Sequence, residues 1–233
     1  MKTYKIHFIR HGLTEGAILG RYIGHTDEPL SAEGAAQLEA LRRDCVYPHA
    51  EAVISSPLSR CIQTAAILYP DNEPAVIRDF IECDFGEFEG LSAESLLDYP
   101  EFGEWLKGGR EAAPPHGESS EAFGNRIYAA FISTVDGLFK SGIDSVAIIT
   151  HGGVIAALMS AFGIPELPMH EWMTPCGCGY TVSITPSLWQ RIYKFEVLSD
   201  LPEDYEDYEV YEEFLLDDCE EEEYDDWDDS DPI

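Results

Sequence analysis

Four short apolar runs, set well apart along the chain of 233 residues, constrain its fold most strongly. Each run is rich in β-branched or aromatic residues, which is typical of buried β-strands. The runs cover residues 4–9, 50–55, 145–150 and 180–185. Helical patterns rather than tight turns separate most of them, so we expect crossover helices to connect the strands. The sequence therefore predicts an α/β fold with a mainly parallel central sheet.

Helix signals fill the segments between the strands. Ser31 is a suitable N-cap, and Ser56 followed by Pro57 is typical of a helix start. Apolar residues recur at helical spacing along one face of the segment after Ser119. The predicted helices cover about 31–43, 56–69, 119–140 and 154–163, and a final strand is expected within 189–198. We expect helices on both faces of the sheet.

Acidic residues are concentrated at the end of the chain. The formal net charge is −31, and residues 199–233 hold 19 of the 45 Asp and Glu residues with neither Lys nor Arg. The remaining 26 acidic and 14 basic residues give residues 1–198 a charge of −12. We therefore expect a folded domain over 1–198 and an acidic tail over 199–233, which is flexible or docks loosely on the domain or on a partner. An acidic surface repels nucleic-acid phosphates, so no nucleic-acid partner is expected.

The sequence also bears on where the protein is located in the cell and on whether it binds a metal. No run approaches the ~18 apolar residues of a membrane span, and the start of the chain does not resemble a signal peptide. We expect a cytoplasmic protein with no membrane partner. Cys176 and Cys178 form the only close cysteine pair. A zinc site of this kind requires a second pair, so no metal site is expected.

Three predicted strand ends carry cationic or imidazole side chains. An Arg-His-Gly triplet occupies residues 10–12, Arg60 falls in the first turn of a predicted helix, and a His-Gly-Gly triplet occupies residues 151–153. Ligands of α/β sheets gather beyond the carboxyl ends of the strands, where helix N-termini favour anions. Guanidinium groups bind phosphoryl oxygens with two parallel hydrogen bonds. The sequence therefore predicts a phosphate pocket.

A phosphate pocket with histidines and a carboxylic acid can support phosphoryl transfer. A neutral imidazole is a competent nucleophile when its other nitrogen is held in one tautomer. A leaving alkoxide needs a proton, which a nearby carboxylic acid supplies. The segment FIECDFGEFEG at 80–90 contains Glu82, Asp84, Glu87 and Glu89. It is the predicted source of that acid.

Four motifs together resemble the histidine phosphatase superfamily, which is also described as phosphoglycerate-mutase-like. They are RHG at 10–12, SSPLSRCIQTA at 55–65, ECDFGEFEG at 82–90 and THGG at 150–153, in the order and spacing of that family. The resemblance covers about residues 1–195 and implies a three-layer α/β sandwich. It also implies an enzyme that needs neither a metal nor an organic cofactor.

The resemblance implies a role for each of five residues. His11 would be the nucleophile and form a phosphohistidine, in the tautomer fixed by the Gly12 backbone carbonyl. The phosphoryl oxygens would be bound by Arg10, Arg60 and His151. Glu82 would donate a proton to the leaving group and then activate water. A raised pKa suits that acid, and we expect the negative charges of the neighbouring acidic residues in 84–87 to raise it.

Further substrate contacts follow from the same resemblance. They are expected at Gly152, Thr14, Tyr22, Ile23 and Gly24. The chain departs from the family at Ala17, where the family often has a phosphate-binding asparagine, and at Ile23, where it often has a small polar residue. Both departures remove hydrogen-bonding groups, so we expect either weaker phosphate binding or an altered choice of substrate, with the five core residues unaffected. Tyr22, Phe85 and Trp105 are candidates for an apolar substrate wall or for the core.

The reaction predicted from these features is hydrolysis of a small phosphomonoester. A mutase holds a highly anionic sugar acid, which calls for more cationic residues than Lys107, Arg110 and Arg126 between 91 and 126. The block RHGLTEGAILGRYIGHTDEPL at 10–30 is most similar to α-ribazole phosphatases. Phosphoglycerate-mutase-type transfer remains one alternative, and a non-catalytic module that binds a phosphorylated ligand is the other.

Overall fold

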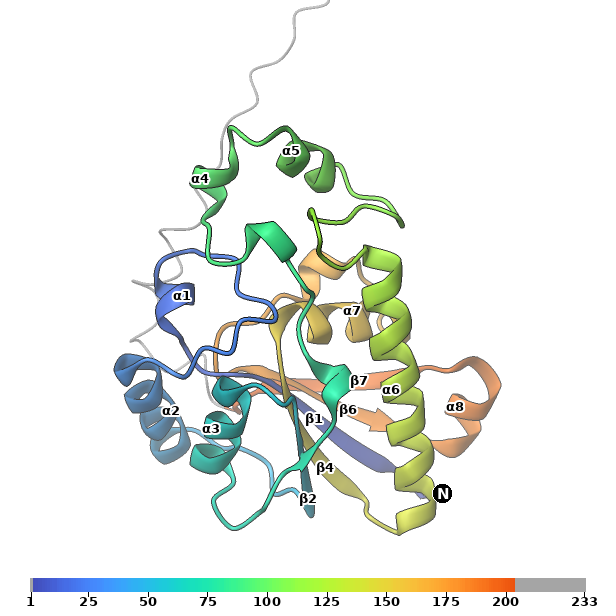
Figure 1. Ribbon diagram of the computed structural model, residues 1–233. Coiled ribbons are helices and arrows are strands. Elements are labelled where there is room, and N and C mark those ends of the chain that lie inside the picture. The colour runs from blue at the N-terminus through green and yellow to red at the C-terminus, as the bar shows by residue number, and fades with distance from the viewer. Residues whose placement is uncertain (1, 204–233) are drawn as a thin grey trace, which may run out of the picture. The chain divides into compact units, whose positions relative to one another are not determined.

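The computed structural model describes residues 2–203 (Figure 1). The seven strands are β1 (Tyr4–Arg10), β2 (Ala52–Ser55), β3 (Ala75–Val76), β4 (Ser145–Thr150), β5 (Gly163–Ile164), β6 (Gly179–Ile184) and β7 (Phe195–Leu201). They form one sheet in the order β3-β2-β4-β1-β6-β7-β5. Within this sheet β6 runs antiparallel to both of its neighbours, and the other pairings are parallel. The predicted, mainly parallel sheet is confirmed.

Helices cover both faces of the sheet, as predicted (Figure 1). The α-helices are α1 (Glu15–Ile18), α2 (Ala32–Asp44), α3 (Ser59–Leu68), α4 (Ala93–Leu96), α5 (Pro100–Leu106), α6 (Ser120–Ser141), α7 (Gly152–Phe162) and α8 (Pro186–Ile192). Short 3-10 helices are η1 (Arg78–Phe80), η2 (Gly86–Phe88) and η3 (Met169–Trp172). Apolar residues of α2 and α3 pack in one core, and those of α6, α7 and α8 pack in another.

The two cores are separated by the sheet because side chains alternate along a strand. In β4, Val146 and Ile148 pack with the α6 side, whereas Ala147 and Ile149 pack with the α2 and α3 side. These β4 residues are fully buried. A near-continuous apolar run that supplies both faces is what a strand between two helical layers requires. The arrangement is the predicted three-layer sandwich.

Two predicted boundaries differ from the structure. The helix predicted from Ser56 begins at Ser59, because an acid from another segment takes the place of the cap: Asp27 accepts hydrogen bonds from the Ser59 amide at 2.7 Å and from its hydroxyl at 3.0 Å. The final strand predicted within 189–198 starts at Phe195, since its first residues belong to α8.

Strand β7 continues past the predicted domain boundary at residue 198. It pairs with β6 as far as Leu201, and Glu203 pairs with Val46. Residues 199–203 therefore belong to the folded unit that ends at Glu203. The rest of the predicted acidic tail, 204–233, lies outside the described residues, and so does its predicted docking.

A third, smaller apolar cluster packs apart from the two cores. It joins Phe88, Leu96 and Phe102 with partly buried neighbours that include Tyr22 and Trp105. The cluster packs α4 and α5 against the loop around Tyr22 through aromatic contacts, most of them edge-on, with centroids 5.3–6.0 Å apart. In Figure 1 these two helices lie at the top, above α1.

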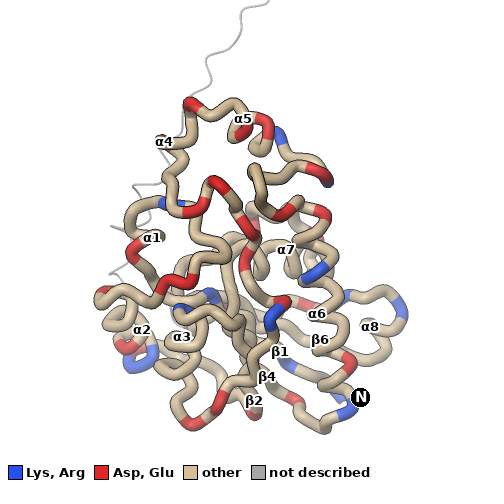
Figure 2. The backbone as a smooth tube through the Cα atoms, viewed as in Figure 1, with Lys and Arg blue, Asp and Glu red and all other residues tan. Residues whose placement is uncertain are grey.

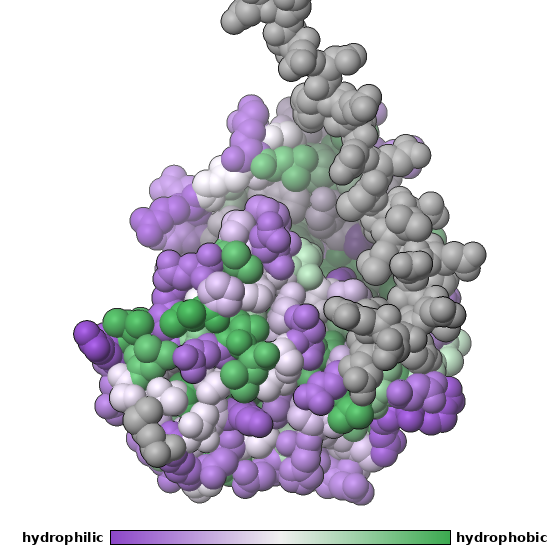
Figure 3. All heavy atoms as spheres, turned by 180° about the vertical axis from the view of Figure 1, so that it is seen from behind, coloured by the Kyte–Doolittle hydropathy of each residue, from purple (hydrophilic) through white to green (hydrophobic). Residues whose placement is uncertain are grey.

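The surface of the described residues mixes acidic and basic side chains. Figure 2 shows Lys and Arg scattered among Asp and Glu over the traced backbone. Some large apolar side chains are exposed, among them Leu106, Met169 and Met173. Figure 3 shows hydrophobic patches, separated by hydrophilic residues, on the opposite side of the molecule. Among the described residues no helix is both long and apolar enough to cross a bilayer.

Candidate active site

Pairing of two parallel strands brings the predicted histidines together. Arg10 ends β1 opposite Thr150, the last residue of β4. The next residue on each chain segment is a histidine, and the His11 amide donates to the Thr150 carbonyl at 2.9 Å. The rings of His11 and His151 meet edge-on, with centroids 5.2 Å apart. Sheet register alone therefore places two residues that are 140 positions apart in contact.

His11 is held in one tautomer. Its Nδ1 lies 2.7 Å from the Gly12 carbonyl oxygen, which can only accept, so Nδ1 carries the proton and Nε2 keeps its lone pair. The predicted contact with the Gly12 carbonyl is present. Gly12 is closely packed: an added Cβ would lie 2.5 Å from Leu38 Cδ1, and the Leu38 side chain would have to shift. Burial lowers the pKa of His11 well below its ordinary value, and nearby Arg60 and Arg10 lower it further, so the ring is neutral at pH 7.

Arg60 is a fully buried cation that bonds to carbonyl oxygens. Its Nη1 donates to Thr26 and its Nη2 to Gly24, each at 2.8 Å, and Nη2 lies 3.3 Å from His151 Nδ1. The Nε of Arg60 and the Nε of Arg10 are buried without an acceptor among the described residues. A buried cation is costly unless an anion compensates it. The two guanidinium groups therefore form a site suited to a phosphoryl group.

Glu89 fixes the loop whose carbonyls hold Arg60. Its carboxylate accepts hydrogen bonds from the backbone amides of Gly24, His25, Thr26 and Phe85, at 2.9–3.2 Å, and from the Thr26 hydroxyl at 2.6 Å. An added Cβ on Gly24 would lie 1.9 Å from the Cys83 carbonyl oxygen, so this residue must be glycine for the loop to close. The Glu89 carboxylate therefore holds this loop in place through its hydrogen bonds.

Glu82 is the buried acid of the 80–90 segment. Its Oε1 accepts from the Cys83 amide at 2.9 Å, and its Oε2 accepts from the Gly153 amide at 3.0 Å. An added Cβ on Gly153 would lie 2.6 Å from Oε1, which explains the second glycine of the His-Gly-Gly triplet. Burial raises the pKa of Glu82, and the two amides together with Arg60 and Arg10 partly offset the rise.

The predicted cause of that raised pKa is wrong, although the direction is right. Asp84 turns away to accept from the Gly86 amide at 2.9 Å and lies 3.4 Å from His25. Glu87 is exposed, 3.4 Å from His116. Desolvation of Glu82, rather than the charge of its neighbours, raises the pKa of this carboxyl.

His151 lies behind the other site residues. It is fully buried, with Nε2 2.7 Å from Ser56 Oγ and Nδ1 facing Arg60. Burial lowers its pKa well below the ordinary value, with His11, Arg60 and Arg10 adding to the shift. His151 is not among the residues that line the cavity described next, so its predicted contact with a phosphoryl group stays a prediction.

A cavity of about 630 Å³ opens above these groups. We call Arg10, His11, Arg60 and Glu82 the floor of this cavity. We call its apolar lining the wall, which comprises Ala17, Tyr22, Ile23, Phe85, Trp105, Phe123, Tyr128, Ala157, Met169 and Met173. The floor is ionic and buried, whereas the wall presents aromatic rings and thioethers. The cavity therefore suits a phosphate joined to an apolar group.

Most of the predicted substrate contacts line this cavity, but one does not. Thr14, Tyr22, Ile23 and Gly152 are on its surface, together with the departure at Ala17. Gly24 does not line the cavity: its amide donates to Glu89 and its carbonyl accepts from Arg60, so its predicted contact with substrate stays a prediction.

Several lining residues were missed by the sequence analysis. Met169 begins η3 and Met173 follows it. The sequence of this short 3-10 helix has neither a helical nor a strand pattern that would predict it. Tyr128 lies on α6, where one cavity-facing ring does not stand out from the core pattern. The aromatic residues Tyr22, Phe85 and Trp105, which were candidates for a wall, do line the cavity.

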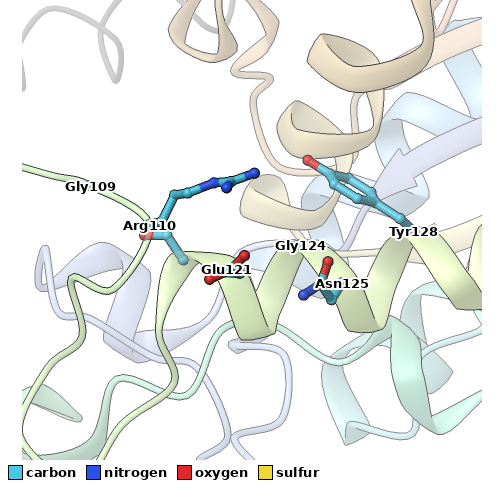
Figure 4. A pocket seen from close by; sticks show the side chains of 7 residues that line it. Gly109, Arg110, Glu121, Gly124, Asn125 and Tyr128 are labelled. Carbon is cyan, nitrogen blue, oxygen red and sulfur yellow. The ribbon is translucent and has the colours of Figure 1, made fainter.

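A second, polar cavity of about 390 Å³ adjoins the first. Ser120, Gly124 and Tyr128 line both. In Figure 4 the Arg110 side chain extends over α6 toward the Tyr128 hydroxyl, and Glu121, Gly124 and Asn125 lie beneath it on the helix. Across residues 2–203, no group of three or more His, Cys, Asp or Glu side chains is placed to hold a metal ion.

Comparison with known proteins agrees with this geometry. Residues 6–193 match the model of the histidine phosphatase superfamily, branch 1. The adenosylcobalamin/alpha-ribazole phosphatase of Escherichia coli strain K12 is 28% identical over 185 residues, which are 77% of this chain and 90% of that protein. A probable phosphoglycerate mutase of Proteus mirabilis is 30% identical over 168 residues, 69% of this chain and 76% of its own.

A solved structure agrees in fold. The alpha-ribazole phosphatase of Shigella flexneri superposes with a TM-score of 0.71 at 25% identity, covering 83% of this chain and 94% of that chain. The family match spans most of both cores and every floor residue. The chain therefore belongs to the histidine phosphatase superfamily, and it is a phosphatase of that superfamily's branch 1.

Proposed function

We propose that this phosphatase hydrolyses small phosphomonoesters in two steps at the floor of the cavity. In the first step His11 Nε2 attacks phosphorus, the bond from phosphorus to the ester oxygen breaks, and Glu82 gives its proton to the departing oxygen. In the second step a water molecule attacks the phosphohistidine, and its proton returns to Glu82. The bond from phosphorus to His11 then breaks, which releases inorganic phosphate and restores the enzyme.

One observation carries this proposal. The hydrogen bond from His11 Nδ1 to the Gly12 carbonyl leaves Nε2 unprotonated, and His11 lines the same cavity as the buried carboxyl group of Glu82. The lowered pKa of His11 favours a neutral nucleophile, and the raised pKa of Glu82 favours its protonated form. The unused donors of Arg10 and Arg60 support binding and neutralisation of the phosphoryl oxygens.

The wall supports a substrate whose leaving group is apolar or aromatic. Tyr22, Phe85 and Trp105 present ring surface to the cavity, and aromatic rings bind flat apolar groups well. Two compared proteins are named alpha-ribazole phosphatases. We propose α-ribazole phosphate, or an ester of similar chemistry, as the substrate.

The two alternatives receive less support. One compared protein is named a probable phosphoglycerate mutase. The basic residues that line this cavity, however, are Arg10, Arg21 and Arg60, and its wall is apolar, which suits a sugar acid with two anionic groups poorly. A non-catalytic phosphate sensor has no use for a buried acid such as Glu82 that is costly to keep.

The test is a phosphomonoester panel with purified full-length protein. Metal-free p-nitrophenyl phosphate should be hydrolysed, and a chelator should leave the rate unchanged. Among α-ribazole phosphate, phosphoserine and 3-phosphoglycerate, the first should have the highest kcat/KM, and 3-phosphoglycerate should yield phosphate rather than an isomer. Absence of turnover by folded protein would overturn the enzymatic proposal, and an isomer as the main product would favour the mutase.

A further inference from the structure

The segment that leads to Glu82 has backbone carbonyls that no sheet satisfies. Residues 78–80 form the 3-10 helix η1, and irregular backbone follows. Four consecutive carbonyls nevertheless accept hydrogen bonds from side chains. Arg126 donates to those of Asp79, Ile81 and Glu82, at 2.7, 2.9 and 3.2 Å, and Thr150 donates to that of Phe80 at 2.8 Å.

Arg126 is itself fixed on a long helix. It lies on α6, and its side chain is 19% exposed. Glu118 accepts from its Nε at 3.0 Å and from its Nη2 at 2.7 Å. The Glu118 amide in turn donates to the Asp84 carbonyl at 2.8 Å. The backbone is therefore held on both sides of Glu82, by Arg126 before it and by Glu118 after it.

Arg126 acts on Glu82 through hydrogen bonds rather than through charge. Its own charge is compensated by Glu118 in a two-bond pair. The charges that offset the raised pKa of Glu82 are those of Arg60 and Arg10. Five hydrogen bonds from one planar group to three carbonyls and a carboxylate require the guanidinium fork, which a lysine ammonium cannot reproduce.

We propose that Arg126 is a positioning residue for proton transfer: it holds the backbone of Glu82 so that the carboxyl group meets the departing oxygen of the substrate. This inference rests on the proposed role of Glu82 as the acid. Proton transfer requires hydrogen-bond reach, so a shift of the Glu82 backbone weakens acid catalysis while His11, Arg10 and Arg60 stay in place.

The test compares two esters that differ in their need for a proton. Nitrophenolate leaves as an anion, whereas an alkoxide must be protonated as it departs. Values of kcat/KM report phosphoryl transfer to His11, because later hydrolysis of the phosphoenzyme does not enter them. Arg126→Met should lower kcat/KM for ethyl phosphate on the order of 10²-fold and that for p-nitrophenyl phosphate by less than about threefold. For Arg126→Lys, kcat/KM for ethyl phosphate should lie between the values for Arg126→Met and wild type.

Matched variants make the result decisive. Glu82→Gln should show the same dependence on the leaving group, and Arg191→Met, an exposed arginine on α8, should leave both esters unchanged. Equal losses with both esters for Arg126→Met, or for Arg126→Lys if the methionine variant does not fold, would overturn the proposal. If Glu82→Gln itself shows no dependence on the leaving group, the proposed role of Glu82 fails instead.

Discussion

The floor and the wall of the cavity are built in opposite ways. The floor consists of ionisable side chains, three of them buried, that bond to backbone groups and come mainly from strand ends and helix starts. The wall consists of apolar side chains, most of them partly exposed, and it draws heavily on irregular segments and short helices. Arg10 and His11 are placed by the sheet, whereas Trp105 and Tyr22 are placed by a small aromatic cluster of their own.

This difference separates chemistry from substrate choice. Arg10 and His11, which strand register places, cannot move without disturbing the strands that pack in both cores. The wall can change by substitution within the third cluster while the floor stays in place. One floor can therefore serve many phosphate esters, and the wall determines which ester binds.

The largest expected effect is the loss of the nucleophile. His11→Ala should lower kcat for p-nitrophenyl phosphate on the order of 10⁴-fold, because no phosphohistidine can form. Acid-labile phosphate trapped on the protein by rapid quenching should disappear with it. The control is His7→Gln on β1, where His7 contacts Thr181 Oγ1 and Ser145 Oγ at 3.0 Å and does not line the cavity. Trapped phosphate on His11→Ala would refute the assignment.

Loss of the acid should act more selectively. Burial raises the pKa of Glu82 and lowers that of His11, and both shifts favour the working state, in which Glu82 is protonated and His11 is neutral. Activity with ethyl phosphate should therefore fall as pH rises through the Glu82 pKa. Glu82→Gln should remove that alkaline fall and lower kcat/KM by about 10²–10⁴-fold. If the alkaline fall survives in this variant, another group causes it.

A change in the wall should affect substrates unequally. Trp105→Ala should raise KM for an aromatic phosphate ester about tenfold, because ring contact and buried apolar area are lost. Ethyl phosphate reaches little of the wall, so its KM should stay within about twofold. Tyr99→Ala is the matched control, since Tyr99 is exposed and does not line the cavity. Equal changes in KM with both esters would contradict the idea that the wall, unlike the floor, acts on substrate choice.

The smallest expected effects are on thermal stability. A floor variant should gain stability relative to wild type as pH rises, whereas a wall variant should lose stability. A raised Glu82 pKa means that the folded protein binds this proton more tightly than the unfolded chain, so stability falls as pH rises above about 4.3. Glu82→Gln removes this pH-dependent loss, so the Tm of this variant relative to wild type should rise from pH 4 to pH 8. Trp105→Ala should destabilise the protein at every pH. Thermal melts across pH measure both.

The sequence predicted the floor better than the wall for a physical reason. Strands and long helices have periodic signals, and residues 10–12 and 151–153 follow strands whose register fixes their positions. Glu82 could be selected from four neighbouring acids only by resemblance. The contacts that distinguish it, such as the Gly153 amide on its carboxylate, come from a distant segment.

The misses share the same origin. Ser56 was assigned to a helix start, but its hydroxyl faces His151 and Asp27 takes over at Ser59. The hydrogen bonds of Gly24 were likewise not predicted: its amide donates to Glu89. In each case a carboxylate from a distant segment accepts a hydrogen bond from a backbone amide. The local sequence pattern does not predict such a long-range contact.

The carboxylate of Glu89 bears on how a phosphate ester binds, because it orders the loop at Arg60 in advance. The loop that positions Arg60 is folded around an anion built into the chain itself. It is ordered before any ester arrives, so no conformational entropy is lost in that loop on association. Arrival of substrate and departure of phosphate then require no rearrangement of this loop at Arg60.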